Sequence, residues 1–208
     1  MTYLCAGLYA EGPTDYAFLL PLLDQLLPQI AVDVLREIPI IGPSVGIDAG
    51  AHGPARRDAR IAAAVRAHWD QCTLFVIHAD GSGDPDRARR EQVEPGLGAA
   101  RAEHPDLAAV ACVPVREIEA WLLADSAPFR KLFPSAAALA MPDQPEGLID
   151  PKKTLREVLH SSGGASLRGL EVFDFFGVNV DPAALRRLPA FRKFEEDLAT
   201  AMRAAARP

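Results

Sequence analysis

The chain has 208 residues, of which 49% are hydrophobic and 24% are charged, and its formal net charge at pH 7 is −6. This composition excludes a disordered or fibrous protein and is typical of a soluble globular chain. No unbroken apolar stretch reaches the roughly 18 residues that span a bilayer, and the N-terminus lacks the basic region of a signal peptide, so we expect a cytoplasmic protein with no membrane partner.

Four apolar runs are predicted to form strands, and the segments between them are predicted to form helices. The strands are expected at residues 3–10, within 30–41, at 73–79 and at 107–115, and the helices from 13, over 55–69, from 86 towards 103 and over 117–125. Pro21 is expected to kink the first helix. Because strand and helix alternate, we predict an α/β fold with a mostly parallel four-stranded sheet sandwiched by helices.

The character of the chain changes after residue 126. Residues 127–208 show no further strand pattern and carry predicted helices at 151–159 and within 181–206. We therefore expect an α/β core over 1–126 and a C-terminal helical extension over 127–208 that packs on this core.

Acidic residues follow three of the four predicted strands. They are Glu11 and Asp15 after the first strand, Asp80, Asp84 and Asp86 after the third, and Glu117 and Glu119 after the fourth. Since the carboxyl ends of parallel strands lie along one edge of a sheet, these side chains are expected to converge there. Converging carboxylates repel one another unless they are protonated or bridged by a cation, so the pattern predicts a hard divalent metal ion.

Each acidic cluster also has a purely structural interpretation. Glu11 is then a solvated turn residue, and Asp15 favours the positive N-terminus of the first helix. Either Asp84 or Asp86 caps the helix that follows the third strand. Glu119 is harder to explain in this way, because it lies beside the buried face of its helix, where a charge needs a partner.

His78 shares strand parity with Asp80 and is expected to point towards the same edge. A histidine within an apolar strand is more often a hydrogen-bonded core residue. His78 is therefore left out of the predicted site.

The EGPTD turn after the first strand, the Asp-led loop after the third, the REIEAWLLAD segment and a downstream lysine together resemble the TOPRIM domain. The resemblance is closest to the TOPRIM domain of overcoming-lysogenization-defect nucleases and to a bacterial domain-of-unknown-function family with EGPTD and REIEAWLLAD motifs. It covers about residues 1–160. It implies a compact α/β domain that uses one or two Mg²⁺ or Mn²⁺ ions for phosphodiester cleavage, with genome defence as a setting.

The resemblance also implies roles for individual residues. The expected catalytic residues are Glu11, Asp80, Lys152 and Lys153, the last two being alternatives for a single lysine. The expected metal ligands are Glu11, Asp15, Asp80, Asp84, Asp86, Glu117 and Glu119. The second acid of the D-x-D pair falls on Ser82, so Asp84 or Asp86 replaces it or the site is weakened. His52, Arg56 and Arg57 are expected to hold a nucleic-acid strand.

The expected partner is nucleic acid, and DNA is favoured over RNA. An ATPase encoded nearby and a second copy of the chain are further candidate partners. A rival interpretation is a non-catalytic TOPRIM-like binding module that acts as the companion of an ATPase, which Ser82 and the acidic net charge favour. The chain has no P-loop pattern, so any ATPase activity belongs to another chain. A dinucleotide-binding fold is disfavoured, because no G-x-G-x-x-G follows the first strand.

Overall fold

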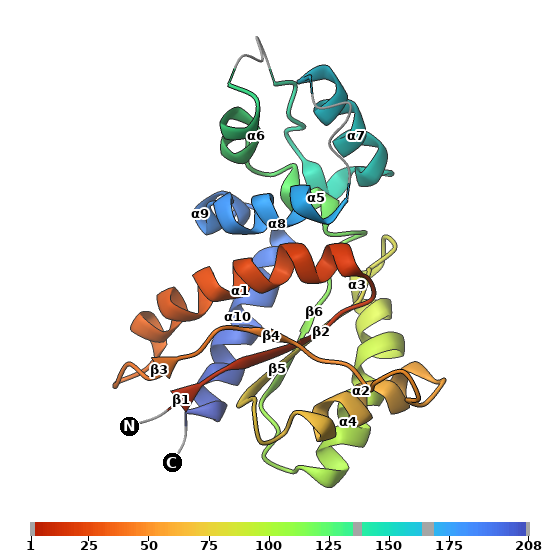
Figure 1. The fold of residues 1–208 in the computed structure, drawn as a ribbon, viewed down its shortest axis with the longest axis vertical. Coiled ribbons are helices and arrows are strands. Elements are labelled where there is room, and N and C mark those ends of the chain that lie inside the picture. The colour runs from red at the N-terminus through yellow and green to blue at the C-terminus, as the bar shows by residue number, and fades with distance from the viewer. Residues whose placement is uncertain (1–2, 135–138, 164–168, 207–208) are drawn as a thin grey trace.

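The computed structural model describes residues 3–134, 139–163 and 169–206 and has an α/β fold (Figure 1). Its main sheet has four parallel strands in the order β4-β2-β5-β6. A separate parallel pair joins β1 to β3. The strands are β1 (Tyr3–Leu4), β2 (Ala6–Tyr9), β3 (Ile40–Ile41), β4 (Val45–Gly46), β5 (Leu74–His78) and β6 (Ala109–Cys112).

Helices lie on both faces of the sheet and continue beyond it. Four of them, α1 (Pro13–Val34), α2 (Arg57–Ala67), α4 (Glu94–Glu103) and α10 (Pro189–Ala205), pack against the strands. The remaining helical segments are α3 (Pro85–Ala88), the π-helical turn η1 (Arg89–Val93), α5 (Glu119–Leu122), α6 (Ala127–Leu132), the 3₁₀ turn η2 (Pro145–Gly147), α7 (Pro151–Ser161), α8 (Leu170–Asn179) and α9 (Pro182–Leu185). The predicted α/β class with a parallel four-stranded sheet is confirmed.

Side-chain alternation along the strands creates two apolar layers. Leu8, Val76 and Val110 face α1 and α10, whereas Phe75 and Ile77 face α2 and α4. β5 is buried on both faces along its whole length, as its unbroken apolar sequence predicted.

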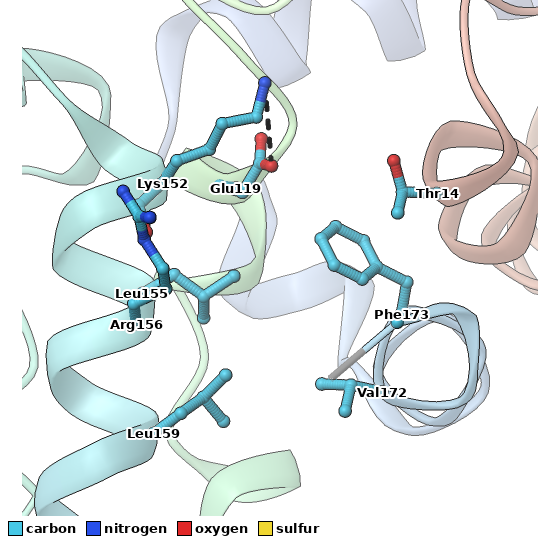
Figure 2. Close-up of a pocket in the computed structure, with 9 residues that line it drawn as sticks. Thr14, Glu119, Lys152, Leu155, Arg156, Leu159, Val172 and Phe173 are labelled. Carbon is cyan, nitrogen blue, oxygen red and sulfur yellow. Dashed lines mark hydrogen bonds and ion pairs between the residues drawn. The ribbon is translucent and has the colours of Figure 1, made fainter. Parts of the chain in front are cut away.

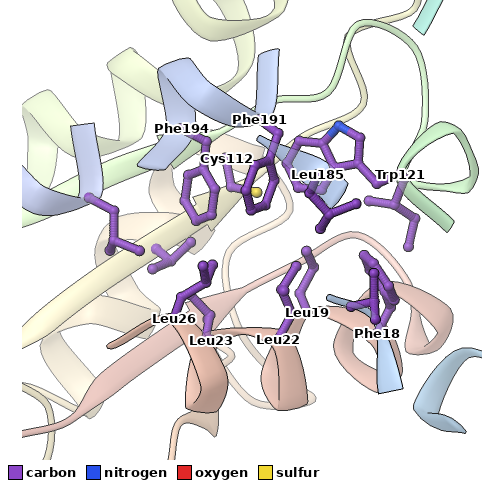
Figure 3. Packing of buried hydrophobic residues seen from close by; sticks show 14 of the residues in the cluster. Phe18, Leu19, Leu22, Leu23, Leu26, Cys112, Trp121, Leu185, Phe191 and Phe194 are labelled. Carbon is purple, nitrogen blue, oxygen red and sulfur yellow. The ribbon is translucent and has the colours of Figure 1, made fainter. Parts of the chain in front are cut away.

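One continuous apolar core includes residues from both sides of the expected boundary at 126. In Figure 3, Trp121 and Cys112 lie beside Phe191 and Phe194 of α10, across from the leucines of α1. The Trp121 and Phe191 rings meet edge to face with centroids 5.2 Å apart. The C-terminal helix α10 thus covers the sheet beside α1.

The prediction of a second strand within residues 30–41 is confirmed only for the last two residues of that range. α1 continues through Pro21 to Val34, and only Ile40–Ile41 of the expected range forms a strand. The strand that pairs with β2 is Val45–Gly46, within a stretch whose glycines and prolines suggested a loop. Two-residue strands carry too little periodicity to be recognised, because their position is decided by the partner strand.

By length and composition alone, α1 could cross a membrane. In the fold it is a core helix, since Leu19, Leu22, Leu23 and Leu26 are buried against the sheet and the C-terminal helices. Such a buried apolar stripe is how a long helix of a globular protein packs.

Two further helices depart from expectation. The helix predicted from 86 towards 103 is divided into α3, the π-helical turn η1 and α4, and Pro95 lies in the first turn of α4, where its missing N–H group is tolerated. α8 was not predicted, because its apolar residues are nearly consecutive. It packs on α1 at Gly177, where a Cβ atom would lie 2.5 Å from the Phe18 carbonyl oxygen.

Two glycines of α4 allow a matched test of the packing between α2 and α4. A Cβ atom at Gly96 would lie 2.7 Å from Ile61 Cβ, whereas one at Gly98 meets nothing within 4 Å. We expect Gly96→Ala to lower the free energy of unfolding by about 1–3 kcal/mol through overpacking. Gly98→Ala should raise it by about 1 kcal/mol through helix propensity. Urea unfolding of the two variants checks this, and equal effects of the same sign would contradict the packing described here.

Candidate acidic site at the strand ends

The strand order places a site at one edge of the sheet. From β2 the chain moves outwards to β4, then returns to β5 on the other side of β2, so strand order reverses between β2 and β5. In open parallel sheets, ligands bind outside the carboxyl ends of the strands at such a switch point. Glu11 follows β2 and Asp80 follows β5, so both lie at this edge.

The first group at this edge consists of Asp15, His78 and Asp80. His78 is completely buried, and its Nε2 atom lies 3.8 Å from Asp15 Oδ2 and 3.6 Å from Asp80 Oδ1. Its Nδ1 atom lies 3.0 Å from the Cys112 carbonyl oxygen, so Nδ1 carries a proton and donates to it. Among the described residues, His78 Nε2 and Asp80 Oδ1 are buried without a hydrogen-bond partner.

Two opposing effects set the pKa of His78. Burial alone lowers it, but the contacts with Asp80, Cys112 and Asp15 outweigh this and raise the pKa to about 10. His78 is therefore a buried imidazolium at neutral pH, held between two carboxylates. Asp15 also accepts the Gly12 N–H group at 2.9 Å, so its expected structural role at the start of α1 coexists with its place in this group.

The second group joins Glu11 to Arg57. Arg57 Nη1 lies 3.0 Å from Glu11 Oε1, while Nη2 donates to the His78 carbonyl oxygen at 2.7 Å and Nε donates to that of Gln92 at 3.0 Å. The guanidinium group therefore ties the end of β2 to the end of β5. With three contacts inside the molecule, Arg57 is a structural cation of the site, and its expected contact to nucleic acid stays a prediction.

The third group contains Glu117, Glu119 and Lys152. Lys152 Nζ lies 2.9 Å from Glu117 Oε1. It also lies 4.0 Å from Glu119 Oε1, a contact that Figure 2 shows. Burial raises the pKa of Glu119 to about 7, and the charges of Glu117 and Asp80 act in the same direction, while Lys152 opposes them. The third group is therefore close enough to Asp80 for their charges to interact.

The Asp80 loop supplies fewer ligands than expected. Asp84 Oδ1 accepts the Arg87 N–H group at 2.9 Å and caps α3, and Asp86 is exposed in the first turn of that helix. Neither is gathered with Asp80. Ser82 and Gly83 have positive φ angles of 50° and 94°, which turn the chain away from the strand end.

Three other predicted residues lie outside the site. Lys153 is exposed, with its Nζ atom 3.9 Å from Glu157 Oε1, so Lys152 is the lysine that joins the acids. Arg56 pairs with Asp58 at 2.7 Å on the surface, and His52 is exposed on a turn. Neither contacts the acidic groups.

The carboxylates at this edge are of the kind that divalent cations bind. Within the described part of the chain, however, no group of three His, Cys, Asp or Glu side chains is already in a metal-holding arrangement. Five carboxylates (Glu11, Asp15, Asp80, Glu117, Glu119) face three cations (Arg57, His78, Lys152). When all are charged, two negative charges remain. Carboxylate oxygens are the ligands that hard divalent ions prefer, and the Asp80 oxygen without a partner is the natural first one.

Sequence reasoning brought Asp80, Glu119 and Glu11 to one edge and named Arg57 and Lys152, but it left out His78, which lies between Asp15 and Asp80. His78 was set aside as a core residue, and it is one, with a hydrogen bond to the Cys112 carbonyl group. The shared strand parity of His78 and Asp80 was the signal that could have placed His78 in the site.

The fold and this edge define a parallel α/β protein with an acidic site at the switch point of its sheet. Residues 10–199 match the model of the family described as Domain of unknown function (DUF4276), and the chain belongs to this family. The match confirms the resemblance to a domain-of-unknown-function family; the TOPRIM relationship stays a prediction. No curated protein and no solved structure matches the chain significantly.

Proposed function

We propose that the protein is a nuclease that cleaves phosphodiester bonds with Mg²⁺ or Mn²⁺ held at the ends of β2, β5 and β6. The observation that carries this proposal is the gathering of carboxylates at these strand ends, where the buried Oδ1 atom of Asp80 has no hydrogen-bond partner among the described residues. DNA in the cytoplasm, in genome defence, is the substrate and setting that the TOPRIM resemblance implies.

Asp80, Asp15 and Glu119 would hold the ion. The chemistry that such an ion supplies when bound is polarisation of the phosphate and activation of water. The other residues of the site position its carboxylates: the His78 imidazolium faces the proposed ligands Asp15 and Asp80, and Arg57 orients the neighbouring Glu11.

Lys152 is the cation best placed to neutralise charge that develops on a phosphate. Its side chain is half exposed, in contrast to the buried His78, and it lies between Glu117 and the edge of an open pocket. A preorganised cation at a developing negative charge typically contributes a factor of about 10²–10³ to the rate.

The matched lysines of α7 test this function. With plasmid DNA and Mg²⁺ or Mn²⁺, we expect wild-type nicking that EDTA stops, a loss of about 10²-fold in Lys152→Ala, and no loss in Lys153→Ala. Gel-based nicking rates provide the measurement. No cleavage by the wild-type protein with either ion, or equal rates in the two variants, would contradict the proposal.

A non-catalytic binding module is the second candidate, and the Asp80 loop favours it. Ser82 occupies the position of the second acid, and Asp84 is engaged as a helix cap. A module of this kind would bind nucleic acid or a partner without metal-dependent cleavage, so the nicking experiment distinguishes the two candidates.

A further inference from the structure

Two pockets adjoin the acidic site and share Lys152 and Arg156 as their common wall. The first, the apolar pocket, has a volume of about 360 Å³ and lies between α7 and α8 (Figure 2). The second, the polar pocket, has a volume of about 510 Å³ and lies between the start of α7 and the Asp80 loop. Both volumes are typical of ligand sites.

Apolar side chains from two helices line the apolar pocket. Leu155 and Leu159 come from α7, and Val172 and Phe173 come from α8. Figure 2 shows the Phe173 ring on the opposite side of the cavity from Leu155. Phe173 is only partly buried, whereas Phe176 on the same helix is completely buried against Phe129. An aromatic ring exposed to such a cavity offers a flat surface on which a nucleobase can stack.

Cations surround the polar pocket. Arg116, Lys152 and Arg156 line it together with Glu117 and Asp150. Within the described residues, neither Arg116 nor Arg156 forms an ion pair, although Arg156 Nε donates to the Lys152 carbonyl oxygen at 3.3 Å. Asp150 is already engaged, since it accepts the Lys153 N–H group at 2.8 Å. Two uncommitted guanidinium groups beside a lysine are suited to bind a phosphate.

The carboxylates of the acidic site stand at the junction of the two pockets. Glu119 forms the polar end of the apolar pocket, and Glu117 lines the polar pocket. A ligand with a flat ring in the first pocket and a phosphate in the second would therefore place the bond between them next to these acids.

We infer that the site binds an unpaired nucleotide of a nucleic-acid strand, with its base against Phe173 in the apolar pocket and its phosphate between Arg116, Lys152 and Arg156 in the polar pocket. This inference rests on the proposed nuclease function and defines its substrate. A base within a duplex is stacked and paired, so it has to leave the helix before it enters such a pocket. The expected substrates are single strands, strand ends and unpaired regions, including those that negative supercoiling opens in plasmid DNA, rather than the interior of a relaxed duplex.

The test measures binding of the full-length protein to a fluorescent single-stranded oligonucleotide in EDTA, and to a blunt duplex of the same sequence. We expect tighter binding to the single strand. Phe173→Leu should weaken this binding by about 5- to 150-fold, the range that the loss of one stacking contact gives. Phe173→Tyr, which keeps the ring, should bind as the wild-type protein does. Val178→Ala is the control, because Val178 is exposed on the same helix and does not line the pocket.

Equal binding of duplex and single strand, or unchanged single-strand binding by Phe173→Leu, would overturn the inference. Because these measurements contain no metal ion, they are independent of cleavage. Normal binding by Phe173→Leu together with loss of nicking in Lys152→Ala would reject the nucleotide pocket and retain the nuclease. Binding of a free nucleoside monophosphate with the same dependence on Phe173, but no binding of a strand, would contradict the strand as the substrate.

Discussion

Replacement of Asp80 by asparagine is expected to lower metal-dependent cleavage by about 10³-fold, the largest effect of any single substitution in the site. Asparagine has the same shape but no charge, and His78 keeps Asp15 as a carboxylate partner, so the fold should be retained while the proposed metal ligand is lost. Asp80 follows a completely buried strand, and its buried Oδ1 atom has no hydrogen-bond partner among the described residues. Nicking rates at several Mn²⁺ concentrations provide the measurement.

Asp84→Asn is the matched control in the same loop. Asp84 caps α3 by accepting the Arg87 N–H group, and asparagine caps helices about as well as aspartate. We expect this variant to cleave at a rate close to that of the wild-type protein. A loss as large as that of Asp80→Asn would show that Asp84 is a ligand and that the loop rearranges when the ion binds, whereas full activity in Asp80→Asn would remove Asp80 from the catalytic site.

The second large effect concerns stability. His78→Ala is expected to lower the free energy of unfolding by about 3–5 kcal/mol, because it removes the cation of a buried charge group and leaves Asp15 and Asp80 without their partner. Urea unfolding in EDTA measures this. His160→Ala, a substitution at an exposed position of α7, is the control and should change the stability by less than about 0.5 kcal/mol.

The charges of Asp15, His78 and Asp80 also predict that the stability of the protein depends on pH. The pKa of His78 is raised to about 10 in the folded state, whereas an unfolded histidine has a pKa of roughly 6.5. A group whose pKa is raised on folding stabilises the protein fully below its unfolded pKa, and this contribution is lost as the pH rises through the folded value. Between pH 6.5 and 10, the wild-type protein should therefore lose more stability than His78→Ala. Parallel stability curves for the two proteins would mean that His78 is neutral in the fold.

Much of the fold is encoded in patterns that a single strand or helix carries alone. β5 was predicted within one residue at each end, because a run buried on both faces has no competing interpretation. The bounds of β3 and the existence of β4 could not be predicted, since each strand has two residues and is defined by its pairing with a neighbour. α8 was not predicted for a related reason. Its sequence lacks helical periodicity, and its position depends on the packing of Gly177 against α1.

For the candidate site, the rule that parallel strands end at one edge brought Glu11, Asp80 and Glu119 together correctly. The contacts of Arg57 and Lys152 with the acids could not be predicted by this rule. Arg57 meets Glu11, and Lys152 meets Glu117, across separations of 46 and 35 residues that no local motif records. The chain therefore neutralises part of its acidic edge with its own side chains, and Asp84, one of the seven expected metal ligands, is engaged instead as the cap of α3.

We expect a divalent ion to bind at the acidic edge between β2 and β5. Anomalous density from a crystal soaked in Mn²⁺ would locate this ion. The predicted result is a peak at roughly 2.1 Å from oxygens of Asp80 and of Asp15 or Glu119, since hard divalent ions of this size bind carboxylates at about that distance. A peak bound only to Asp84 and Asp86, or no peak at this edge at a Mn²⁺ concentration that supports cleavage, would contradict the account.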